Sequence, residues 1–422
     1  MKQYSSYIDS GIQWLNEIPA HWKILPGRAL FTENKEKNDG GEHQVLSLSY
    51  GSIIIKKNVN EGLIPENYSS YQYIRPGYII VRCTDLQNDK VSLRTSISEY
   101  EGIITGAYLG LIPKPICRSK FIHYLLRAWD CSKELYRYGS GLRQSLSWND
   151  FKYLLLPIPT PEEQDAIVAY LDAATAKIDE AIAQQQRMID LLSERKQIII
   201  DKTTTKGAFS GKELHDSGVD YIGEIPEGWT TTKIKFVASY NDEVLSEDSA
   251  DKDIEYVEIG DVQYGKGITG SANYLFKDAP SRARRITRKG DIIVSTVRTY
   301  LKAVAVIKKD GLIVSTGFVV IRPKSNVDAQ FLAYAILNSA IISEVEKNSV
   351  GTSYPAVNAW EVVDIKVPIP PIEEQKRIAL YLSEIEKNTE KAIEGCGMII
   401  QALQERKQII INDVVTGKVK VV

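Results

Sequence analysis

The sequence predicts a mixed α/β protein that is an internal repeat, with two α/β bodies alternating with two long helices. Three observations support this fold class. The heptapeptide ERKQIII at 194–200 recurs unchanged at 405–411, and an identical segment of this length indicates a duplication. Each copy lies in a long stretch of helical periodicity. Upstream of each copy, short β-rich runs are broken by Gly, Asn and Asp, as expected for strands joined by turns.

Length and composition exclude several classes of protein. A chain of 422 residues is too long for a single core, so two to three domains are expected. The composition is that of a soluble globular protein, and no apolar run approaches the length of a membrane span. The N-terminal segment lacks the layout of a signal peptide, which favours a cytoplasmic protein. Four cysteines and four histidines are scattered, so neither disulfides nor a metal site is expected.

The repeat extends well beyond the heptapeptide. PIPTPEEQDAIVAYLD from Pro157 aligns without a gap to PIPPIEEQKRIALYLS from Pro368, and roughly 20 of the 50 positions from there are identical. Further upstream, DSGIQWLNEIPAHW from Asp9 matches DSGVDYIGEIPEGW from Asp216. The chain therefore reads as a lead-in, a variable body and a helical segment, followed by the same three again.

These matches set the predicted boundaries. They are a first body at 1–155 with its lead-in at 9–22, a first helix at 156–208, a second body at 209–366 with its lead-in at 216–229, and a second helix at 367–422. The bodies resemble each other much less than the segments around them do. Two copies whose flanking segments are similar and whose central regions differ are typical of a protein with two binding sites rather than of one with a single active site.

The helical segment after Thr160 begins with recognisable start signals. Thr160 can cap the helix, Pro161 suits its first position, and Glu163 completes a capping box. In the second copy Pro371 stands at the cap position, so the entry into that helix must differ. Each helix should contain about 40–45 residues and be about 60–65 Å long.

Apolar residues in both helices recur at alternating spacings of four and three, which is typical of a coiled-coil seam. The predicted seam residues are Ile167, Leu171, Ile178, Met188, Leu192 and Ile199 in the first helix, and Ile378, Leu382, Ile385, Ile399, Leu403 and Ile410 in the second. Neither helix can bury its stripe alone. Because both lie in one chain with matching registers, we expect them to pair with each other, and dimerisation between chains is the alternative.

Two parts of the bodies have side chains suited to nucleic acid. Residues 282–324 contain eleven Lys and Arg against two acidic residues, although the whole chain has a net charge of −2. Such a basic stretch is what a phosphate-binding surface requires, and an ordinary solvated surface is the alternative. The turn-rich segment VRCTDLQNDKVSLR (81–94) follows a predicted strand, and STVRTYLK (295–302) occupies the matching place in the second body.

The side chains of these segments include types that read base edges, since Arg can bind guanine, Gln and Asn adenine, and Asp cytosine. A plain polar hairpin is the alternative for 81–94. The candidate DNA-binding residues are Arg82, Thr84, Asp85, Gln87, Asn88, Lys90, Arg94, Arg143, Gln144, Arg282, Arg284, Arg285, Arg298, Tyr300 and Lys302.

Motifs for catalysis are missing. GKGITG (265–270) has the glycine spacing of a dinucleotide site, but no helix follows, which favours a β-turn. The ERK triplet lies within a helix in both copies and has no upstream carboxylate to share a metal, so a structural role is expected. No phosphate-binding loop, methyltransferase loop or hydrolase grouping occurs. The chain is therefore predicted to be a non-catalytic recognition protein.

Taken together, the chain resembles the specificity subunit of type I restriction–modification systems over nearly its whole length. The resemblance is based on the twin lead-ins Glu-Ile-Pro to Trp (17–22, 224–229), the twin helix starts Pro-Ile-Pro to Glu-Glu-Gln (157–164, 368–375) and the twin Glu-Arg-Lys-Gln ends. It implies that each body is a target recognition domain for one half of a split DNA site. It also implies that the two long helices form an antiparallel coiled coil between them, with pseudo-twofold symmetry.

The same resemblance implies the partners. Two methyltransferase subunits would bind the chain, and motor-nuclease subunits would join through them to form a phage-defence complex. Adenine N6 methylation and ATP-driven restriction would belong to those partners, with S-adenosylmethionine, ATP and Mg bound there and no cofactor on this chain.

Helices of ~60 Å can span half-sites one DNA turn apart, about 34–36 Å. Inserting four residues into either helix is then expected to change the spacer length. A scaffold without a DNA role and an enzyme with a cryptic site are the two rival interpretations.

Overall fold

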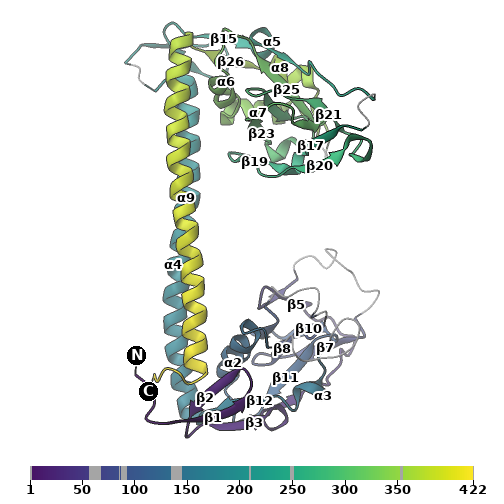
Figure 1. Cartoon of the computed structure of the whole chain (residues 1–422), viewed down its shortest axis with the longest axis vertical. Coiled ribbons are helices and arrows are strands. Elements are labelled where there is room, and N and C mark those ends of the chain that lie inside the picture. Colours follow the sequence, from purple (N-terminus) through teal and green to yellow (C-terminus); the bar gives the residue numbers. More distant parts are fainter. Residues whose placement is uncertain are drawn as a thin grey trace. The chain divides into compact units, whose positions relative to one another are not determined.

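The computed structural model describes residues 2–56, 68–84, 86, 93–134, 145–208, 211–247, 251–351 and 355–421. It divides into two compact units (Figure 1). Unit 1 comprises Met1–Gln185 and Met398–Val422, and unit 2 comprises Gln186–Gly397. Each unit contains one α/β body and parts of both long helices, so the predicted mixed α/β class with two long helices is confirmed.

Each body contains its own four-stranded antiparallel sheet, and the two sheets have the same strand order. In unit 1 the strands, in spatial order, are β4 (Phe31–Glu33), β11 (Leu109–Pro113), β8 (Ile79–Val81) and β9 (Thr95–Ile97). In unit 2 they are β16 (Ala238–Tyr240), β25 (Phe318–Pro323), β22 (Ile292–Ser295) and β23 (Val304–Val306). The common strand order shows that the bodies kept one framework while their sequences diverged.

The remaining strands form small sheets around this framework. In unit 1 the pairs are β1 (Tyr7–Ile12) with β2 (Leu15–Pro19), β3 (Lys23–Pro26) with β12 (Leu155–Ile158), β5 (Leu46–Ser49) with β6 (Ser52–Ile55), and β7 (Tyr71–Ile74) with β10 (Gly102–Thr105). In unit 2 they are β13 (Leu214–Asp216) with β14 (Glu224–Pro226), β15 (Thr230–Lys233) with β26 (Lys366–Ile369), and β18 (Val262–Gln263) with β19 (Gly267–Ile268). Unit 2 also has a second four-stranded sheet, ordered β20 (Ala272–Leu275), β17 (Asp253–Val257), β24 (Ile313–Ser315) and β21 (Ala283–Ile286).

Short helices complete each body. Unit 1 has α1 (Gly27–Leu30), α2 (Ser119–Cys131) and α3 (Trp148–Phe151), and unit 2 has α5 (Ile234–Val237), α6 (Ala329–Ile336), α7 (Ser339–Lys347) and α8 (Ala359–Asp364), besides the 3-10 turns η3 (Ile259–Asp261), η4 (Phe276–Asp278) and η5 (Thr299–Leu301). The helical region 329–347 is divided into α6 and α7. Asn338 caps α7 by accepting a hydrogen bond from the Ala340 N–H, which ends α6 and starts a new helix.

The repeated tryptophans of the lead-ins are core residues. Trp22 is buried against Phe121 of α2, with ring centroids 6.5 Å apart and an interplanar angle of 82°. Trp229 makes the same edge-to-face contact with Phe331 of α6, at 6.5 Å and 86°. Edge-to-face pairs of this kind are favourable beyond their buried area. The lead-in therefore recurs in sequence because it fills the same place in both cores.

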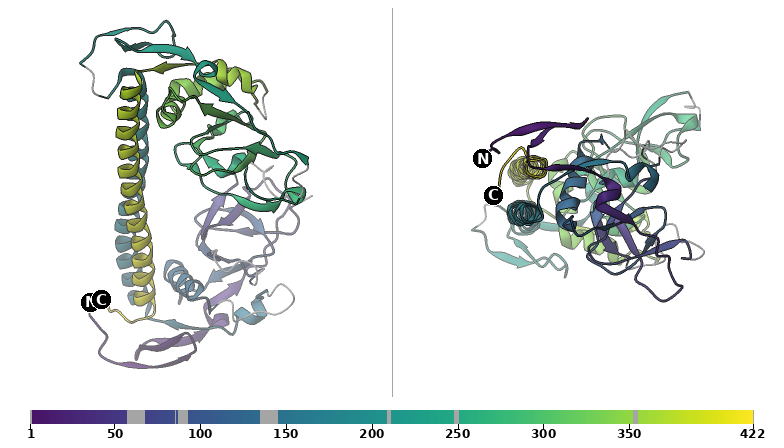
Figure 2. Two further views of the ribbon diagram at one scale, coloured as in Figure 1. Left: turned by 45° about the horizontal axis from the view of Figure 1, so that its top comes forward. Right: turned by 90° about the horizontal axis from the view of Figure 1, so that it is seen from below.

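The long helices are α4 (Pro161–Lys206) and α9 (Ile372–Val415), which lie side by side in Figures 1 and 2. In unit 1, Ile167 near the start of α4 packs in one cluster with Ile411 near the end of α9. In unit 2, Ile200 near the end of α4 packs with Ile378 near the start of α9. Within each unit the helices thus run antiparallel. Among the described residues, no helix has an apolar stretch sufficient to cross a membrane.

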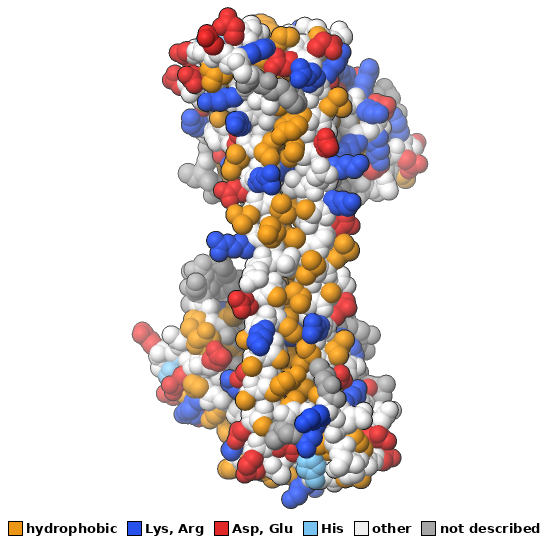
Figure 3. Space-filling view, turned by 90° about the vertical axis from the view of Figure 1, so that its left-hand side faces the viewer, with side chains coloured by type: hydrophobic (Ala, Val, Ile, Leu, Met, Phe, Trp, Pro, Cys, Tyr) orange, Lys and Arg blue, Asp and Glu red, His pale blue; other side chains and the backbone are white. Residues whose placement is uncertain are grey.

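Burial along the predicted heptad seam is uneven. Ile167, Leu171, Ile178, Ile378 and Leu382 are buried, whereas Leu192, Ile199, Ile385, Leu403 and Ile410 are half-buried. Met188 and Ile399 are 49% and 48% exposed. Apolar side chains are visible along the face of the molecule drawn in Figure 3. In α4, the buried positions Gln164 and Ile167 have buried counterparts at Ile200 and Thr203, ten turns of 3.6 residues later. A stripe of period 3.6 drifts out of a heptad pattern by about 20° per heptad.

The start of α4 confirms the cap and corrects the capping box. The Thr160 Oγ1 accepts a hydrogen bond from the Glu163 N–H at 3.4 Å, and the helix begins at Pro161 as predicted. The Glu163 carboxylate, however, bonds elsewhere: it accepts from the Tyr4 hydroxyl at 2.7 Å and lies 2.9 Å from His21 Nε2. This carboxylate therefore holds the N-terminal strand region against the helix.

A buried glutamine holds each body to its helix. The Gln164 side chain donates to the carbonyls of Pro159 and Ile116, each at 3.0 Å, and accepts from the Arg118 N–H at 2.8 Å. Arg118 is the residue that precedes α2. The amide thus ties the start of α4 to the start of the helix that covers the sheet.

The second copy repeats this arrangement. Gln375 donates to the Pro370 carbonyl at 2.8 Å and accepts from the N–H of Asp328, the residue before α6, at 2.9 Å. We name Gln164 and Gln375 the glutamine clamps. Both are buried, which explains why the Glu-Glu-Gln motif occurs twice.

Replacing Gln375 by alanine is expected to lower the free energy of unfolding by about 1–3 kcal/mol, because a buried carbonyl and a buried N–H lose their partner. Gln164→Ala should have a similar effect in unit 1. The measurement is chemical denaturation of the whole chain. The matched control is Glu373→Ala on the exposed face of the same turn, for which a change within about 0.5 kcal/mol is expected. Equal losses for Gln375→Ala and Glu373→Ala would contradict the clamp.

The lysines of the two ERKQ copies make structural contacts, consistent with the role expected for this triplet. Lys196 donates from Nζ to the carbonyl of Gly265 at 2.8 Å. That glycine belongs to the GKGITG segment, which forms the hairpin turn between β18 and β19. Lys407 pairs with Asp179 of the facing helix at 2.6 Å. The first lysine therefore fastens a body to α4, and the second joins the two helices.

Candidate nucleic-acid interface

A loop leaves the sheet at the same point in each body. In unit 1 it joins β8 to β9, and the Arg82 N–H donates to the Arg94 carbonyl at 2.8 Å. In unit 2 it joins β22 to β23, and the Ser295 N–H donates to the Ala303 carbonyl at 2.9 Å. We name the segments 82–94 and 295–303 the strand-end loops. They are equivalent in the fold and differ in length, sequence and internal support.

A second segment supports each strand-end loop from outside. In unit 1 the Leu146 N–H donates to the Cys83 carbonyl at 2.9 Å. In unit 2 the Val357 N–H donates to the Thr296 carbonyl at 2.8 Å, and the Arg298 N–H donates to the Pro355 carbonyl at 2.8 Å. The segments that contain Leu146 and Val357 thus lie against the strand-end loops.

Arg94 does not have the role predicted for it. Its side chain is fully buried, and its Nη1 donates to the carbonyls of Arg82 and Thr84 at 3.3 and 2.8 Å. Its N–H donates to the buried Asp130 of α2 at 2.5 Å. A guanidinium used in this way braces the loop from beneath and cannot reach a base edge. Arg82 and Thr84 are half-buried at the start of the same loop.

Six further candidates cannot be placed. Asp85, Gln87, Asn88, Lys90, Arg143 and Gln144 lie outside the described residues. Their assignment as contacts stays a prediction.

The strand-end loop of unit 2 has an unusual backbone. Arg298 and Lys302, on either side of η5, have φ angles of 52° and 50°, in the left-handed region that non-glycine residues rarely adopt. Between them Thr299 is buried and accepts a hydrogen bond at 2.8 Å from the Ser349 hydroxyl. The Tyr300 side chain is 54% exposed. A strained turn that turns an aromatic ring and an arginine outward is a common feature of binding loops.

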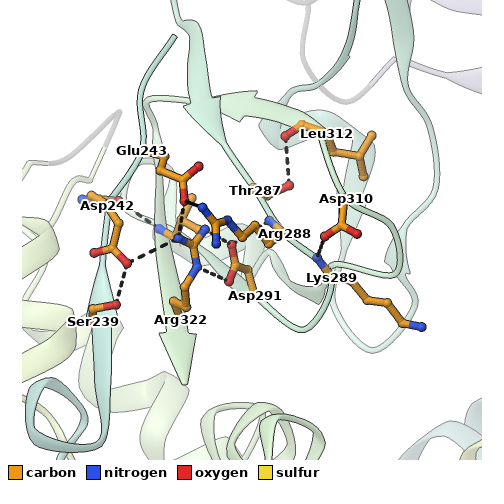
Figure 4. A network of polar contacts seen from close by, with 12 residues as sticks. Ser239, Asp242, Glu243, Thr287, Arg288, Lys289, Asp291, Asp310, Leu312 and Arg322 are labelled. Atoms are coloured by element: carbon orange, nitrogen blue, oxygen red, sulfur yellow. Dashed lines mark hydrogen bonds and ion pairs between the residues drawn. The ribbon is translucent and has the colours of Figure 1, made fainter. Parts of the chain in front are cut away.

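The basic segment 282–324 is not one continuous basic surface. Arg322 binds Asp291 in a bidentate pair, with its Nε and Nη2 at 2.9 and 2.7 Å from the carboxylate oxygens, and its Nη1 lies 2.6 Å from Glu243 (Figure 4). Arg288 shares the same Glu243 at 2.6 Å. The hydrogen bonds with Asp291, with those to Glu243, raise the pKa of Arg322 above its usual value. Arg288 and Arg322 are therefore paired with carboxylates, one within the segment (Asp291) and one outside it (Glu243).

Other basic residues of the segment are also occupied. Arg284 lies over the Phe276 ring at 4.8 Å, and Lys302 pairs with Glu346 at 3.5 Å. Arg285 is half-buried, and burial lowers the pKa of its guanidinium. Lys309 pairs with Glu255 at 2.5 Å. The prediction of one phosphate-binding stripe is corrected accordingly, because these contacts draw the side chains in different directions.

Arg282 and Arg298 are brought together at a single concave site. Both line a cavity of about 540 Å³ in unit 2, with Tyr256 and Glu258 among the other lining residues. Sequence reasoning named the two arginines and missed Tyr256 and Glu258. No motif marks that segment, because parallel pairing of β17 with β24 is what places it beside the arginines. Within the described part of the chain, no group of His, Cys, Asp or Glu could hold a metal ion.

Comparison with known proteins bears on this arrangement. Residues 226–395 match the model of the type I restriction modification DNA specificity domain. The chain is 26% identical over 384 residues to the MjaVIII specificity subunit of Methanocaldococcus jannaschii, covering 86% of this chain and 87% of that one. It is also 26% identical to the putative MjaX specificity subunit of the same organism, with 96% of both chains covered. The chain is thus similar to type I restriction-modification specificity subunits over most of its length.

A solved structure shares the fold of this chain. It is a chain from a study of complex assembly and conformational transition in the type I R-M system, and it matches with a TM-score of 0.65 and 16% identity. The match covers 94% of this chain and 98% of that chain. The two proteins therefore have the same overall architecture.

Proposed function

We propose that this chain is a type I specificity subunit that reads a bipartite DNA target, one half with each body, and directs adenine N6 methylation and ATP-dependent restriction by partner subunits. The observation that carries the proposal is the pair of strand-end loops. They leave equivalent points of equivalent sheets and share no sequence, which suits two readers of different half-sites. Loops on a rigid sheet are where binding residues are expected.

The two loops are also held in different ways. Unit 1 uses the buried guanidinium of Arg94 to brace a long loop, whereas unit 2 uses a short loop with two left-handed residues. Because the support differs as well as the sequence, each body presents its own set of side chains. This supports recognition of two unlike half-sites separated by a nonspecific gap.

The partners follow from the same proposal. Two methyltransferase subunits would bind the duplicated frame, and motor-nuclease subunits would join through them. S-adenosylmethionine, ATP and Mg would be bound by those subunits, and this chain would supply recognition without catalysis, in the cytoplasm.

The experiment is a methylation map. The chain would be co-expressed with the methyltransferase subunit of its own locus in a methylation-free host, and the DNA sequenced for N6-methyladenine. A split motif with a fixed gap is the expected result. A stable complex that methylates nothing would favour a partner-binding scaffold, and methylation by the purified chain alone would favour a cryptic enzyme.

A further inference from the structure

The cavity lined by Arg282 and Arg298 in unit 2 combines opposite charges. Arg282 lies just before β21, and Arg298 lies in the strand-end loop at the start of η5. Glu258 follows β17 and is exposed at the same cavity. Tyr256 is buried on β17 and adds its ring to the lining, while Ser315, at the end of β24, adds a hydroxyl. Four separate segments therefore converge on one hollow.

The backbone of Glu258 fixes its place at this hollow. Its N–H donates to the Asp261 carboxylate at 3.0 Å, and its own carboxylate accepts from the Asp261 N–H in the same capping box around η3. The backbone of Arg298 is fixed as well, since its N–H bonds to the Pro355 carbonyl and its φ is 52°. The backbone positions that carry the two side chains are thus set before any ligand arrives, which reduces the entropy lost on binding.

The Glu258 carboxylate indicates whether the cavity binds a DNA phosphate or a base pair. Arginines alone would suit a phosphate, but a carboxylate in the same hollow repels a phosphate. A base pair has both kinds of partner. In the major groove, guanine offers the acceptors O6 and N7 to an arginine fork, and cytosine offers its N4 amino group to a carboxylate. No other base pair places two adjacent acceptors beside an amino donor on its partner base.

We propose that this cavity reads one G·C pair of the half-site recognised by unit 2, with Arg298 and Arg282 toward guanine and Glu258 toward cytosine. This inference rests on the proposed function and assigns to it a base pair and three residues. Lys302 and Tyr300 then flank the reading site, and Arg322 lies in the supporting framework.

The test compares methylation maps of the wild-type chain and two variants, Arg298→Ala and Glu258→Gln, each co-expressed with the methyltransferase subunit. Both variants are expected to relax the same single base pair in the same half-site. Discrimination at that pair should fall by about 10- to 100-fold. Size-exclusion chromatography of each complex checks that the variants still assemble.

The matched control is Lys289→Ala. Lys289 is exposed in the same body and its ammonium points away from the neighbouring ion pairs (Figure 4). This variant loses one positive charge and should leave the motif unchanged. An unchanged motif with uniformly weaker methylation in Arg298→Ala would mean a phosphate contact and would overturn the base-pair reading. Relaxation of different pairs by the two variants would overturn it too. No split motif from the wild-type complex would overturn the proposed function itself, and the cavity proposal with it.

Discussion

Replacing Arg322 by methionine is expected to lower the free energy of unfolding by about 3–5 kcal/mol, one of the two largest effects predicted for this chain. Asp291, its bidentate partner, is 2% exposed and would be left with a buried and uncompensated carboxylate. Glu243 would lose one of its two arginines. The measurement is guanidinium-induced unfolding of the whole chain.

A matched pair of variants separates the ion pair from the loss of charge. Lys308→Met removes a positive charge from an exposed position of the same body and should change stability by less than about 0.5 kcal/mol. The double variant Arg322→Met with Asp291→Asn should recover part of the loss, because no buried charge remains. The interaction between Arg322 and Asp291 would be refuted if Asp291→Asn lowered the free energy of unfolding by the same amount in the Arg322→Met background as in the wild-type chain.

Inserting four residues into both long helices at facing positions is expected to lengthen the gap between the two half-sites and leave the half-sites unchanged. This second large effect rests on the proposed function. Four helical residues add about 6 Å, which corresponds to about two base pairs of B-DNA. Suitable positions follow Gln185 in α4 and Gly397 in α9, where the two units divide. The measurement is again the N6-methyladenine map.

The control for the insertion keeps the length and changes the residue. Gln185→Ala should leave both the gap and the half-sites as they are. A changed half-site sequence after the insertion would show that the helices do more than set a separation. Loss of all methylation, with the complex still assembled, would show that the partners tolerate only one geometry.

Local signals in the sequence were enough for the helices and the main strands. The start of α4 at Pro161 was predicted from Thr160 and Pro161 themselves, since a cap depends on adjacent residues. The strands β8 and β22 are short β-rich runs of the kind from which strands were expected. The antiparallel pairing of the helices agrees with what the family resemblance implied.

Features that depend on distant residues were not predictable. Glu243 is 79 positions from Arg322, so the sequence showed an unbalanced basic run where the fold has ion pairs. Arg94 was a plausible base reader until its burial beneath the loop was visible. Met188 was placed on the seam because periods of 3.5 and 3.6 residues differ noticeably only after several turns. Glu258 reaches the cavity through strand pairing, which no local pattern reports.

The glutamine clamps have a consequence for how such a protein changes over generations. Where they reach across to the bodies, the two amides bond to main-chain atoms, namely the Ile116 carbonyl and the N–H groups of Arg118 and Asp328. Every peptide provides a carbonyl, and every residue except proline an N–H, whatever its side chain. At these points the side chains of a body can therefore be replaced without a matching change in the glutamine that holds it. Contacts between side chains, such as Arg118 with Asp165 and Tyr334 with Glu386, are different, because there a change in the body requires a change in the helix.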